Sequence, residues 1–306
     1  MKSKIKSLLL ILVVFALIFA CNQVNNNSKN ETILKGETSI LVDETLVPII
    51  EDQIEVFESK YPAKINLIAK SEIELMNELQ KGSIGFAVLS RKLTAKEESV
   101  FEKRKIKPRT TPFAIDAIAL IRNNSNKDTI ISLQEVIDFM KGKRNTNIKG
   151  LVFDNPNSST VRYMNNLAGL NAIPENGIFS FKTNQEVIKF VSENDGMIGV
   201  IGVNWLSQPE PTMVKFIEKI SILEVKGLNK NEYVAPTQNN IAEGRYPLAR
   251  DLFIVNCQGF SGLGMGFSSF VAGDIGQRII LKSGLLPIQV PGRNIIIRNE
   301  IENNKK

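Results

Sequence analysis

Histidine is absent from all 306 residues of this chain, and cysteine occurs only twice, at Cys21 and Cys257. Without histidine, the Ser-His-Asp and Cys-His arrangements that activate enzyme nucleophiles cannot form. Histidine-ligated zinc is excluded as well, and Cys257 alone cannot build a thiolate site. The acidic residues also lack the spacing of a calcium loop. We therefore expect no enzyme, no metal, no other cofactor and no intrachain disulfide, and a fold held together by a large hydrophobic core.

A strong excess of one charge is lacking too, although the sequence has 38 basic and 32 acidic residues. Three of the lysines, Lys2, Lys4 and Lys6, belong to the extreme N-terminus. Without them 35 basic residues face 32 acidic ones, and the net charge falls to +3. A balance this close to neutral gives no reason to expect a nucleic-acid partner.

The N-terminus is typical of an export signal. Three lysines precede an apolar run, Leu8–Ala20, of about 13 residues, which is too short to span a bilayer as a helix. Ala20 before Cys21, with Ile18 at position −3, resembles a bacterial lipobox, in which the cysteine receives lipid and becomes the new N-terminus. We expect a signal peptide over 1–20, a lipidated Cys21 with a flexible tether over 21–36, and a polar tail over 296–306. An ordinary secretory signal is the alternative.

Short apolar strands alternate with amphipathic helices after the tether. Such alternation predicts an α/β fold with mostly parallel sheets and helices on both faces. The expected strands are Thr38–Val42, Ile65–Ile68, Gly85–Leu89, Phe113–Ile121, Leu151–Phe153 and Met197–Val203, followed after a less regular stretch by one ending near Ile254. The expected helices are Val47–Lys60, Ser71–Gln80, Thr94–Lys103, Leu133–Met140, Ser158–Leu167, Gln185–Ser192, Leu263–Gly273 and Asp274–Ser283.

Six motifs occur in the order in which a known family carries them. They are Ser90–Thr94, Ile115–Ala119, Asn157–Thr160, Ile198–Gly202, Tyr246–Arg250 and Gly273–Gln277. Together they resemble the PstS-type phosphate-binding proteins of ABC transporters, in a lipoprotein variant similar to those of Bacteroidetes-type bacteria.

The resemblance implies a two-lobed periplasmic binding protein of type II. Each lobe is then a mostly parallel sheet flanked by helices, and crossing hinge strands near Asp116–Arg122 and Arg245–Leu252 join the lobes. Lobe 1 is expected over 37–120 and 247–295, and lobe 2 over 121–246. The lobes are expected to close on the ligand and open without it.

Helix starts supply the donors that a buried oxyanion needs, because their first N–H groups are unpaired and carry partial positive charge. Polar residues follow strands at several expected helix starts, and the family motifs coincide with some of them. The candidate ligand-binding residues at these starts are Thr45, Ser71, Ser90, Arg91, Ser158, Ser159 and Thr160. Ordinary N-capping is the alternative role for the hydroxyls, and a solvated surface position is the alternative for Arg91.

Asp116 interrupts an apolar strand and is the remaining candidate ligand-binding residue. A carboxylate beside an anion discriminates in favour of one that carries a proton, such as hydrogen phosphate, over sulfate, which carries none. Its alternative role is a hinge carboxylate paired with Arg250 or with the backbone.

Three acidic residues depart from the family pattern. Many relatives begin their first helix with a Gly-Ser-Thr-Ser type of loop, whereas this chain has Asp43, Glu44 and Thr45. Where the family usually has an arginine before its serine motif, this chain has Asp154, and Arg162 follows one helical turn later. These differences remove or relocate positive charge where an anion is expected to bind.

The sequence therefore favours a monomeric, lipid-anchored protein of the cell envelope that captures inorganic phosphate for an ABC transporter permease. The same fold with sulfate, molybdate or an organic acid as ligand is a second hypothesis. A sensor or assembly lipoprotein of the envelope is a third, and an enzyme is the most remote.

Overall fold

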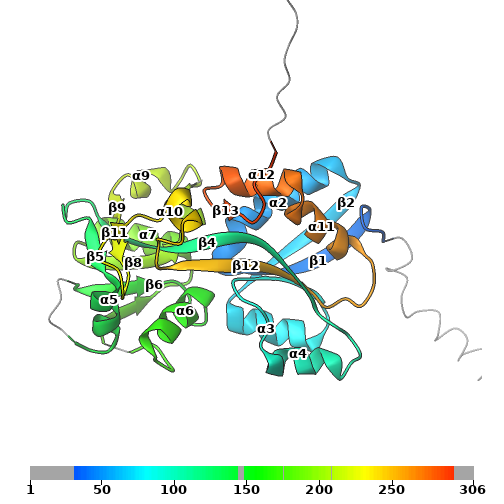
Figure 1. Cartoon of the computed structure of the whole chain (residues 1–306), viewed down its shortest axis with the longest axis horizontal. Coiled ribbons are helices and arrows are strands. Elements are labelled where there is room, and N and C mark those ends of the chain that lie inside the picture. Colours follow the sequence, from blue (N-terminus) through cyan, green and yellow to red (C-terminus); the bar gives the residue numbers. More distant parts are fainter. Residues whose placement is uncertain (1–30, 144–147, 175, 208, 293–306) are drawn as a thin grey trace, which may run out of the picture.

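The computed structural model describes residues 31–143, 148–174, 176–207 and 209–292. They form two α/β lobes joined by two long strands (Figure 1), so the predicted fold class is confirmed. The predicted signal peptide, Cys21, most of the expected tether and the tail lie outside the described residues. Among the residues that are described, no helix is long and apolar enough to span a bilayer.

Lobe 1 is built on β1, which pairs in parallel with β2 on one side and with β3 on the other. Its strands are β1 (Gly36–Asp43), β2 (Ala63–Lys70), β3 (Phe86–Leu89), the first part of β4 (Arg109–Asn123), β12 (Ala249–Asn256) and β13 (Leu286–Pro287). Its helices are η1 (Glu44–Leu46), α2 (Val47–Lys60), α3 (Glu72–Lys81), α4 (Ala95–Glu102), α11 (Leu263–Ala272) and α12 (Asp274–Lys282). Ile40 and Val42 pack in the core with α2 and α11, whereas Leu41 faces α3, as the alternation of a strand requires.

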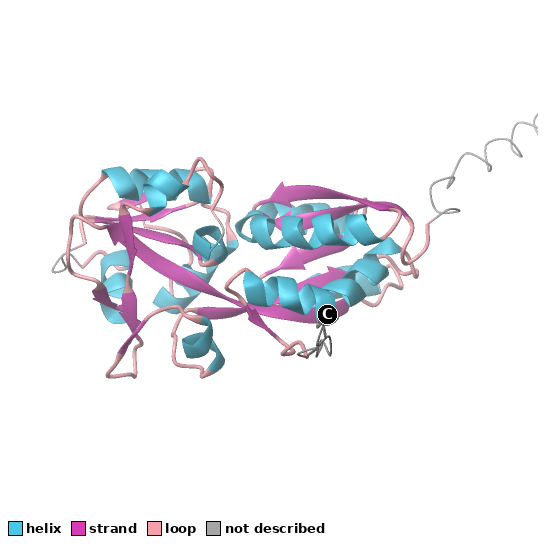
Figure 2. Ribbon diagram, turned by 90° about the horizontal axis from the view of Figure 1, so that it is seen from above, coloured by secondary structure: helices cyan, strands magenta, loops and turns pink. Residues whose placement is uncertain are grey.

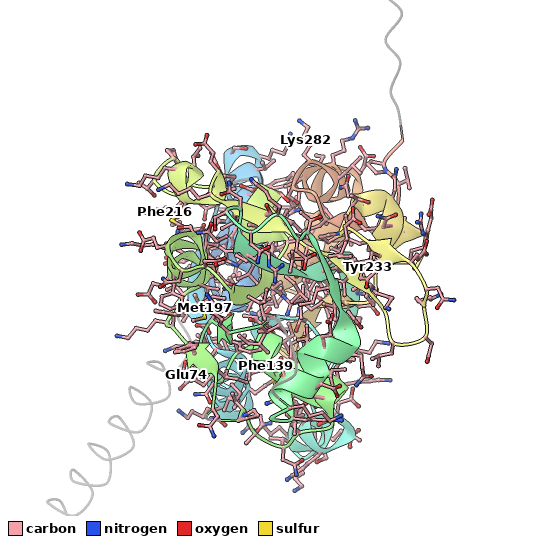
Figure 3. The ribbon with its side chains drawn as sticks, turned by 90° about the vertical axis from the view of Figure 1, so that its left-hand side faces the viewer. Glu74, Phe139, Met197, Phe216, Tyr233 and Lys282 are labelled. Carbon is pink, nitrogen blue, oxygen red and sulfur yellow. The ribbon has the colours of Figure 1, made fainter. Side chains whose placement is uncertain are left out.

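Lobe 2 is built on β6, which pairs in parallel with β7 and β8. Its strands are β5 (Ile130–Ser132), β6 (Gly150–Phe153), β7 (Ile178–Ser180), β8 (Met197–Gly202), β9 (Ile220–Ile222), β10 (Glu224–Lys226) and β11 (Tyr233–Val234). Its helices are α5 (Leu133–Met140), α6 (Ser159–Ala168), α7 (Asn184–Glu193), α8 (Asn204–Ser207), α9 (Val214–Ile217) and α10 (Gln238–Ala242). Helices flank the strands of both lobes (Figure 2). Figure 3 views the molecule from the end of lobe 2, with Phe139 of α5 and Met197 of β8 labelled.

Two antiparallel strands, β4 and β12, run between the lobes. β4 pairs with β12 up to Ala117 and then with β8 from Ile118 to Ile121, so the chain passes from one sheet to the other there. Asp116 lies two residues before Ile118, where the partner changes, and is paired in register with Arg250. The crossing strands thus place one acid and one base at the junction of the lobes.

The carboxyl ends of two parallel strands lead into helices at this junction. β1 ends at Asp43 and continues into η1, while β6 ends at Phe153 and leads to Ser158, the N-cap of α6. Ligands of open α/β sheets bind outside the carboxyl ends of their strands. The segments that follow β1 and β6 are therefore the expected place of a ligand site.

Candidate functional site

The start of η1 in lobe 1 meets the start of α6 in lobe 2. Thr45 Oγ1 lies 3.1 Å from Ser159 Oγ, and both side chains are fully buried. Lobe 2 also binds the Thr45 carbonyl oxygen, because Asn204 Nδ2 donates to it at 3.1 Å and Trp205 Nε1 at 3.0 Å. These contacts hold the lobes together directly at the predicted ligand position.

Arg250 lies at the centre of this junction and binds both lobes. Its Nε and Nη2 donate to Asp116 Oδ2 at 3.0 and 2.8 Å. Its Nη1 donates to Ser159 Oγ at 3.1 Å and its Nη2 to Thr45 Oγ1 at 3.2 Å. Burial opposes the charge on Arg250, but Asp116 and the other nearby carboxyl groups outweigh it and raise the pKa of Arg250. A buried cation therefore bridges hydroxyl groups from the two helix starts.

Asp116 takes the hinge pairing with Arg250 that was one of its two expected roles. Burial raises the pKa of Asp116, and the Arg250 cation acts against that rise. Its Oδ1 is buried without a hydrogen-bond partner in the described part of the chain. That free oxygen is an acceptor for a ligand proton, so the pairing leaves the ligand-discriminating role open.

Asp43 and Asp154, two of the acids by which this chain departs from the family pattern, bind groups at the two helix starts. Asp43 Oδ1 accepts from the backbone N of Thr45 at 3.0 Å and from its hydroxyl at 2.9 Å. Asp154 Oδ1 accepts from Ser158 Oγ at 2.6 Å, and its Oδ2 accepts from Asn184 Nδ2 at 3.2 Å. Both acids are fully buried. Carboxyl oxygens of the chain thus bind donors that an oxyanion would otherwise use.

Asp154 and Glu44 are disposed to hold protons near neutral pH. Burial raises the pKa of Asp154 to about 7 in spite of the bond from Ser158, and the nearby Asp43 adds to the rise. Burial, together with repulsion from Asp154 and Asp43, raises the pKa of Glu44 to about 8. A protonated carboxyl group donates a hydrogen bond and carries no charge. The site at pH 7 is consequently less negative than its composition suggests.

The serine–threonine motif at the start of α6 caps the helix and also contains a hydroxyl group without a hydrogen-bond partner among the described residues. Ser158 caps the helix by accepting from the backbone N of Val161 at 3.3 Å, which is the capping role considered above. Among the described residues, the buried hydroxyls of Thr160 and Ser90 have no hydrogen-bond partner. Unpaired buried hydroxyls are costly unless a water or a ligand satisfies them.

Arg91 lines a groove of about 680 Å³ at the side of the junction together with Glu72 and Ser158, whereas Ser71, directly before Glu72, is fully buried. Arg91 binds acids of its own lobe, with Nε 2.7 Å from Glu72 Oε1 and both terminal nitrogens 2.8 Å from the Glu97 carboxylate. The Ser71 hydroxyl donates to Glu74 at 2.9 Å. Arg91 is therefore committed to ion pairs at the edge of the site.

Arg162 does not replace the arginine that the family has before its serine motif; its Nε pairs with Glu72 Oε1 at 2.6 Å. The Ser90–Arg91 segment is not a helix start either, because α4 begins at Ala95 with Thr94 as its N-cap. Thr94 and Glu97 bond reciprocally in a capping box, which fixes that start.

Sequence reasoning missed Asn204 and Trp205 as junction residues. The chain has a single tryptophan, and it follows the glycine-containing strand β8, but neither signal indicates a partner 160 residues away. In the part of the chain that the structure describes, no group of three or more acidic or cysteine side chains is placed to hold a metal ion.

Comparison with known proteins establishes the family. A profile described as a PBP superfamily domain matches residues 27–274, which is most of the chain. The chain belongs to the PBP superfamily. Within it, the phosphate-binding protein PstS of Pseudomonas aeruginosa is 23% identical over 284 residues, covering 83% of this chain and 84% of the relative.

Solved structures of similar proteins share the fold. A putative phosphate ABC transporter substrate-binding protein from Clostridium perfringens, solved with bound phosphate, has a TM-score of 0.69 at 21% identity and covers 83% of this chain and 100% of its own. An ABC-type phosphate transport receptor from Vibrio cholerae has a TM-score of 0.62 at 19% identity, covering 82% and 100%. The resemblance to PstS-type proteins inferred from the motifs is confirmed.

Proposed function

We propose that this PBP superfamily protein captures phosphate between its lobes as the lipid-anchored binding component of an ABC-type uptake system. The observation that carries the proposal is Arg250, a buried cation that donates to hydroxyls of both lobes at the starts of η1 and α6. A guanidinium beside two helix starts is an arrangement suited to an oxyanion. The names of the similar proteins from Pseudomonas, Clostridium and Vibrio support phosphate as the ligand class.

The acids of the junction favour an anion that carries protons. Asp116 Oδ1 and Asp43 Oδ2 are buried acceptors without a partner among the described residues. Hydrogen phosphate would donate to such an oxygen, whereas sulfate has no proton to donate and would leave it unpaired. Protonated Asp154 and Glu44 would act as donors to the remaining phosphate oxygens.

A competing function follows from the direct contact of the lobes. The Thr45 and Ser159 hydroxyls already bind each other, and Asp43 occupies the Thr45 backbone N–H. A junction that satisfies itself in this way favours a protein whose lobes stay closed without ligand, which suits the sensor or assembly lipoprotein of the envelope better than a transport component that closes on its ligand. Another anion, such as molybdate, sulfate or an organic acid, is the remaining alternative within the same fold.

Calorimetric titration separates these possibilities. Phosphate, sulfate, molybdate and a small organic acid are titrated into the wild type at pH 6 and pH 8, with the Ser158→Ala and Asp116→Asn variants alongside. Ser269→Ala serves as the matched control, because its exposed hydroxyl only bonds back to Met265 within α11. We expect phosphate to bind most tightly, more tightly at pH 6 than at pH 8, and to be weakened by both site substitutions but not by the control.

An absence of heat and of any thermal shift with millimolar phosphate would refute phosphate capture. Binding that is unchanged in both site variants would place the ligand elsewhere. Co-purification of a membrane partner by a chain that binds none of the anions would favour the sensor or assembly function.

A further inference from the structure

A basic loop at the far end of lobe 1 has no role in the site described above. From the end of α4 to the first residue of β4 the chain reads Lys-Arg-Lys-Ile-Lys-Pro-Arg over residues 103–109. All five basic side chains in this loop are exposed. In the part of the chain that the structure describes, none of them forms an ion pair with an acid, although the Arg104 guanidinium donates to the Gln80 carbonyl.

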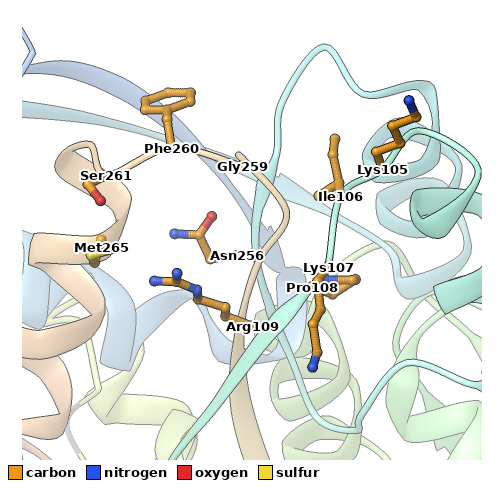
Figure 4. A pocket seen from close by; sticks show the side chains of 10 residues that line it. All are labelled: Lys105, Ile106, Lys107, Pro108, Arg109, Asn256, Gly259, Phe260, Ser261 and Met265. Carbon is orange, nitrogen blue, oxygen red and sulfur yellow. The ribbon is translucent and has the colours of Figure 1, made fainter.

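An exposed aromatic ring adjoins this loop. Lys105, Lys107 and Arg109 line a pocket of about 460 Å³ together with Phe260 and other residues, and Phe260 is 51% exposed. Figure 4 shows Phe260 and Lys105 at the upper rim of the pocket on two different loops. We call the surface formed by Lys105, Lys107, Arg109 and Phe260 the anchor face. Basic side chains around an exposed aromatic ring match the charged headgroups and apolar boundary of a lipid surface.

The described chain begins beside the anchor face. Glu31 Oε1 accepts from the backbone N of Leu263 at 2.7 Å. A Cβ at Gly262 would lie 2.5 Å from this Glu31 oxygen and also 2.5 Å from the Phe260 ring, so both side chains touch the same glycine. The start of the chain and the aromatic ring are thus immediate neighbours.

Two more exposed apolar residues extend the surface at the same place. Ile33 is 47% exposed and Leu34 is 40% exposed. The Ile33 backbone contacts Gly266 of α11, one turn beyond Leu263. The first described residues therefore continue the apolar part of the anchor face. Acids on this side include Glu31, which is bonded to the α11 backbone, the exposed Glu37, which lines a neighbouring pocket with Glu31, and Glu102, at the end of α4.

The position of Cys21 in the sequence brings a membrane within reach. Cys21 precedes Glu31 by ten residues. Even a fully extended chain of this length spans no more than about 35 Å. A lipid on Cys21 would hold this end of lobe 1 close to the bilayer, whereas lobe 2 lies at the opposite end of the molecule (Figure 1).

We propose that the anchor face docks on anionic phospholipid headgroups and sets the orientation of lobe 1 on the membrane. The inference rests on the proposed anchor at Cys21. Lysine and arginine side chains are drawn to the negative potential of such a surface, and each raises the membrane partition coefficient about fivefold near it. Screening limits this attraction to roughly a Debye length, so it weakens as salt is added.

Vesicle co-sedimentation tests the proposal on the chain that starts at Asn22 and so contains every element of the fold described above. Vesicles of phosphatidylcholine are compared with vesicles that also contain phosphatidylglycerol. The test variant combines Lys105→Asn, Lys107→Ser and Arg109→Ser, asparagine being chosen because Lys105 has a φ of 60°. The matched control removes three exposed lysines of lobe 2: Lys182→Ser, Lys215→Ser and Lys219→Ser.

We expect the wild type to bind only the phosphatidylglycerol vesicles and to dissociate as salt rises. The test variant should bind roughly 100-fold more weakly and the control about as well as the wild type, given a fivefold effect for each of the three charges removed. Thermal unfolding of all three proteins checks that each is folded. Equal loss in the control, equal binding to both vesicle types, or no vesicle binding at all would overturn the proposal. Because Cys21 is absent from this chain, the result does not depend on whether lipidation occurs.

Discussion

Asp154, the buried acid before α6, allows a prediction of how the stability of the protein changes with pH. Asp154 is fully buried, and burial raises its pKa from 3.8 to about 7. The perturbation is Asp154→Asn, which keeps the shape of the side chain and removes its titration. Asn184 can adapt to the new amide, because its own Oδ1 has no partner among the described residues.

The direction in which stability changes with pH follows from the protons that Asp154 binds in the folded and in the unfolded chain. Below about pH 4 Asp154 is protonated whether the chain is folded or unfolded, so its titration contributes nothing. As pH rises from about 4 to about 7, the unfolded chain releases this proton while the folded chain retains it, and stability falls. Above about pH 7 both states are ionised and the loss is complete. Three pKa units correspond to about 4 kcal/mol, taken as an order of magnitude.

Urea unfolding at several pH values measures the effect as a difference. Between the acid and the alkaline end of this window, Asp154→Asn should gain up to about 4 kcal/mol of unfolding free energy relative to the wild type. The bond from Ser158 to the amide side chain of the Asp154→Asn variant does not titrate, so it adds the same amount to the variant's stability at each pH, and the change in the wild-type bond is already part of the Asp154 pKa shift. Asp195→Asn is the matched control, because this acid is exposed and pairs only with Lys149 at 3.7 Å. A wild-type to Asp154→Asn difference that does not vary with pH would refute the reasoning.

Three further outcomes are expected. Arg250→Met should cost about 3–5 kcal/mol of unfolding free energy in urea titrations, because it leaves Asp116 buried without its cation, and adding Asp116→Leu should recover much of that loss. Emission of Trp205, the single tryptophan, should shift when ligand or pH changes the contact of the lobes, since its indole N–H binds the Thr45 carbonyl; an emission spectrum that is constant under saturating phosphate would count against lobe movement. Cys21→Ser should abolish incorporation of a labelled fatty acid in growing cells, and retained label would contradict the proposed anchor.

Local signals predicted the long helices well. The helix Leu133–Met140 has the bounds predicted for it, because Ser132 caps it and its apolar residues recur with helical spacing. α2 likewise spans Val47–Lys60 as predicted. The strands β9 and β10 were not predicted. They have three residues each, and they exist because β4 and β5, remote in the sequence, pair with them.

The candidate site shows where sequence reasoning stops. Residue types and the positions after strands indicated Ser158 and Thr45, since capping and strand ends are local features. The partners were not local. Arg91 binds Glu97 six residues away but also Glu72, nineteen residues back, and Arg250 reaches Thr45 across 205 residues. The packing of the chain decides which charged side chains pair with each other. A pattern along the sequence does not contain that information.

The protonation of the buried acids at the junction determines which charge state of an oxyanion the site can bind. Fully ionised, Asp43, Asp116 and Asp154 would outweigh Arg250, and a further anion would meet net repulsion in a medium that screens poorly. Protons remove this conflict, and the raised pKa of each of these three acids shows that burial already favours the protonated form. The cost of an additional anion therefore depends on how many protons the site and the ligand bring together. Such a junction would bind a protonated oxyanion best in mildly acidic surroundings, whereas a site with arginine at position 154 would gain attraction for the more highly charged form.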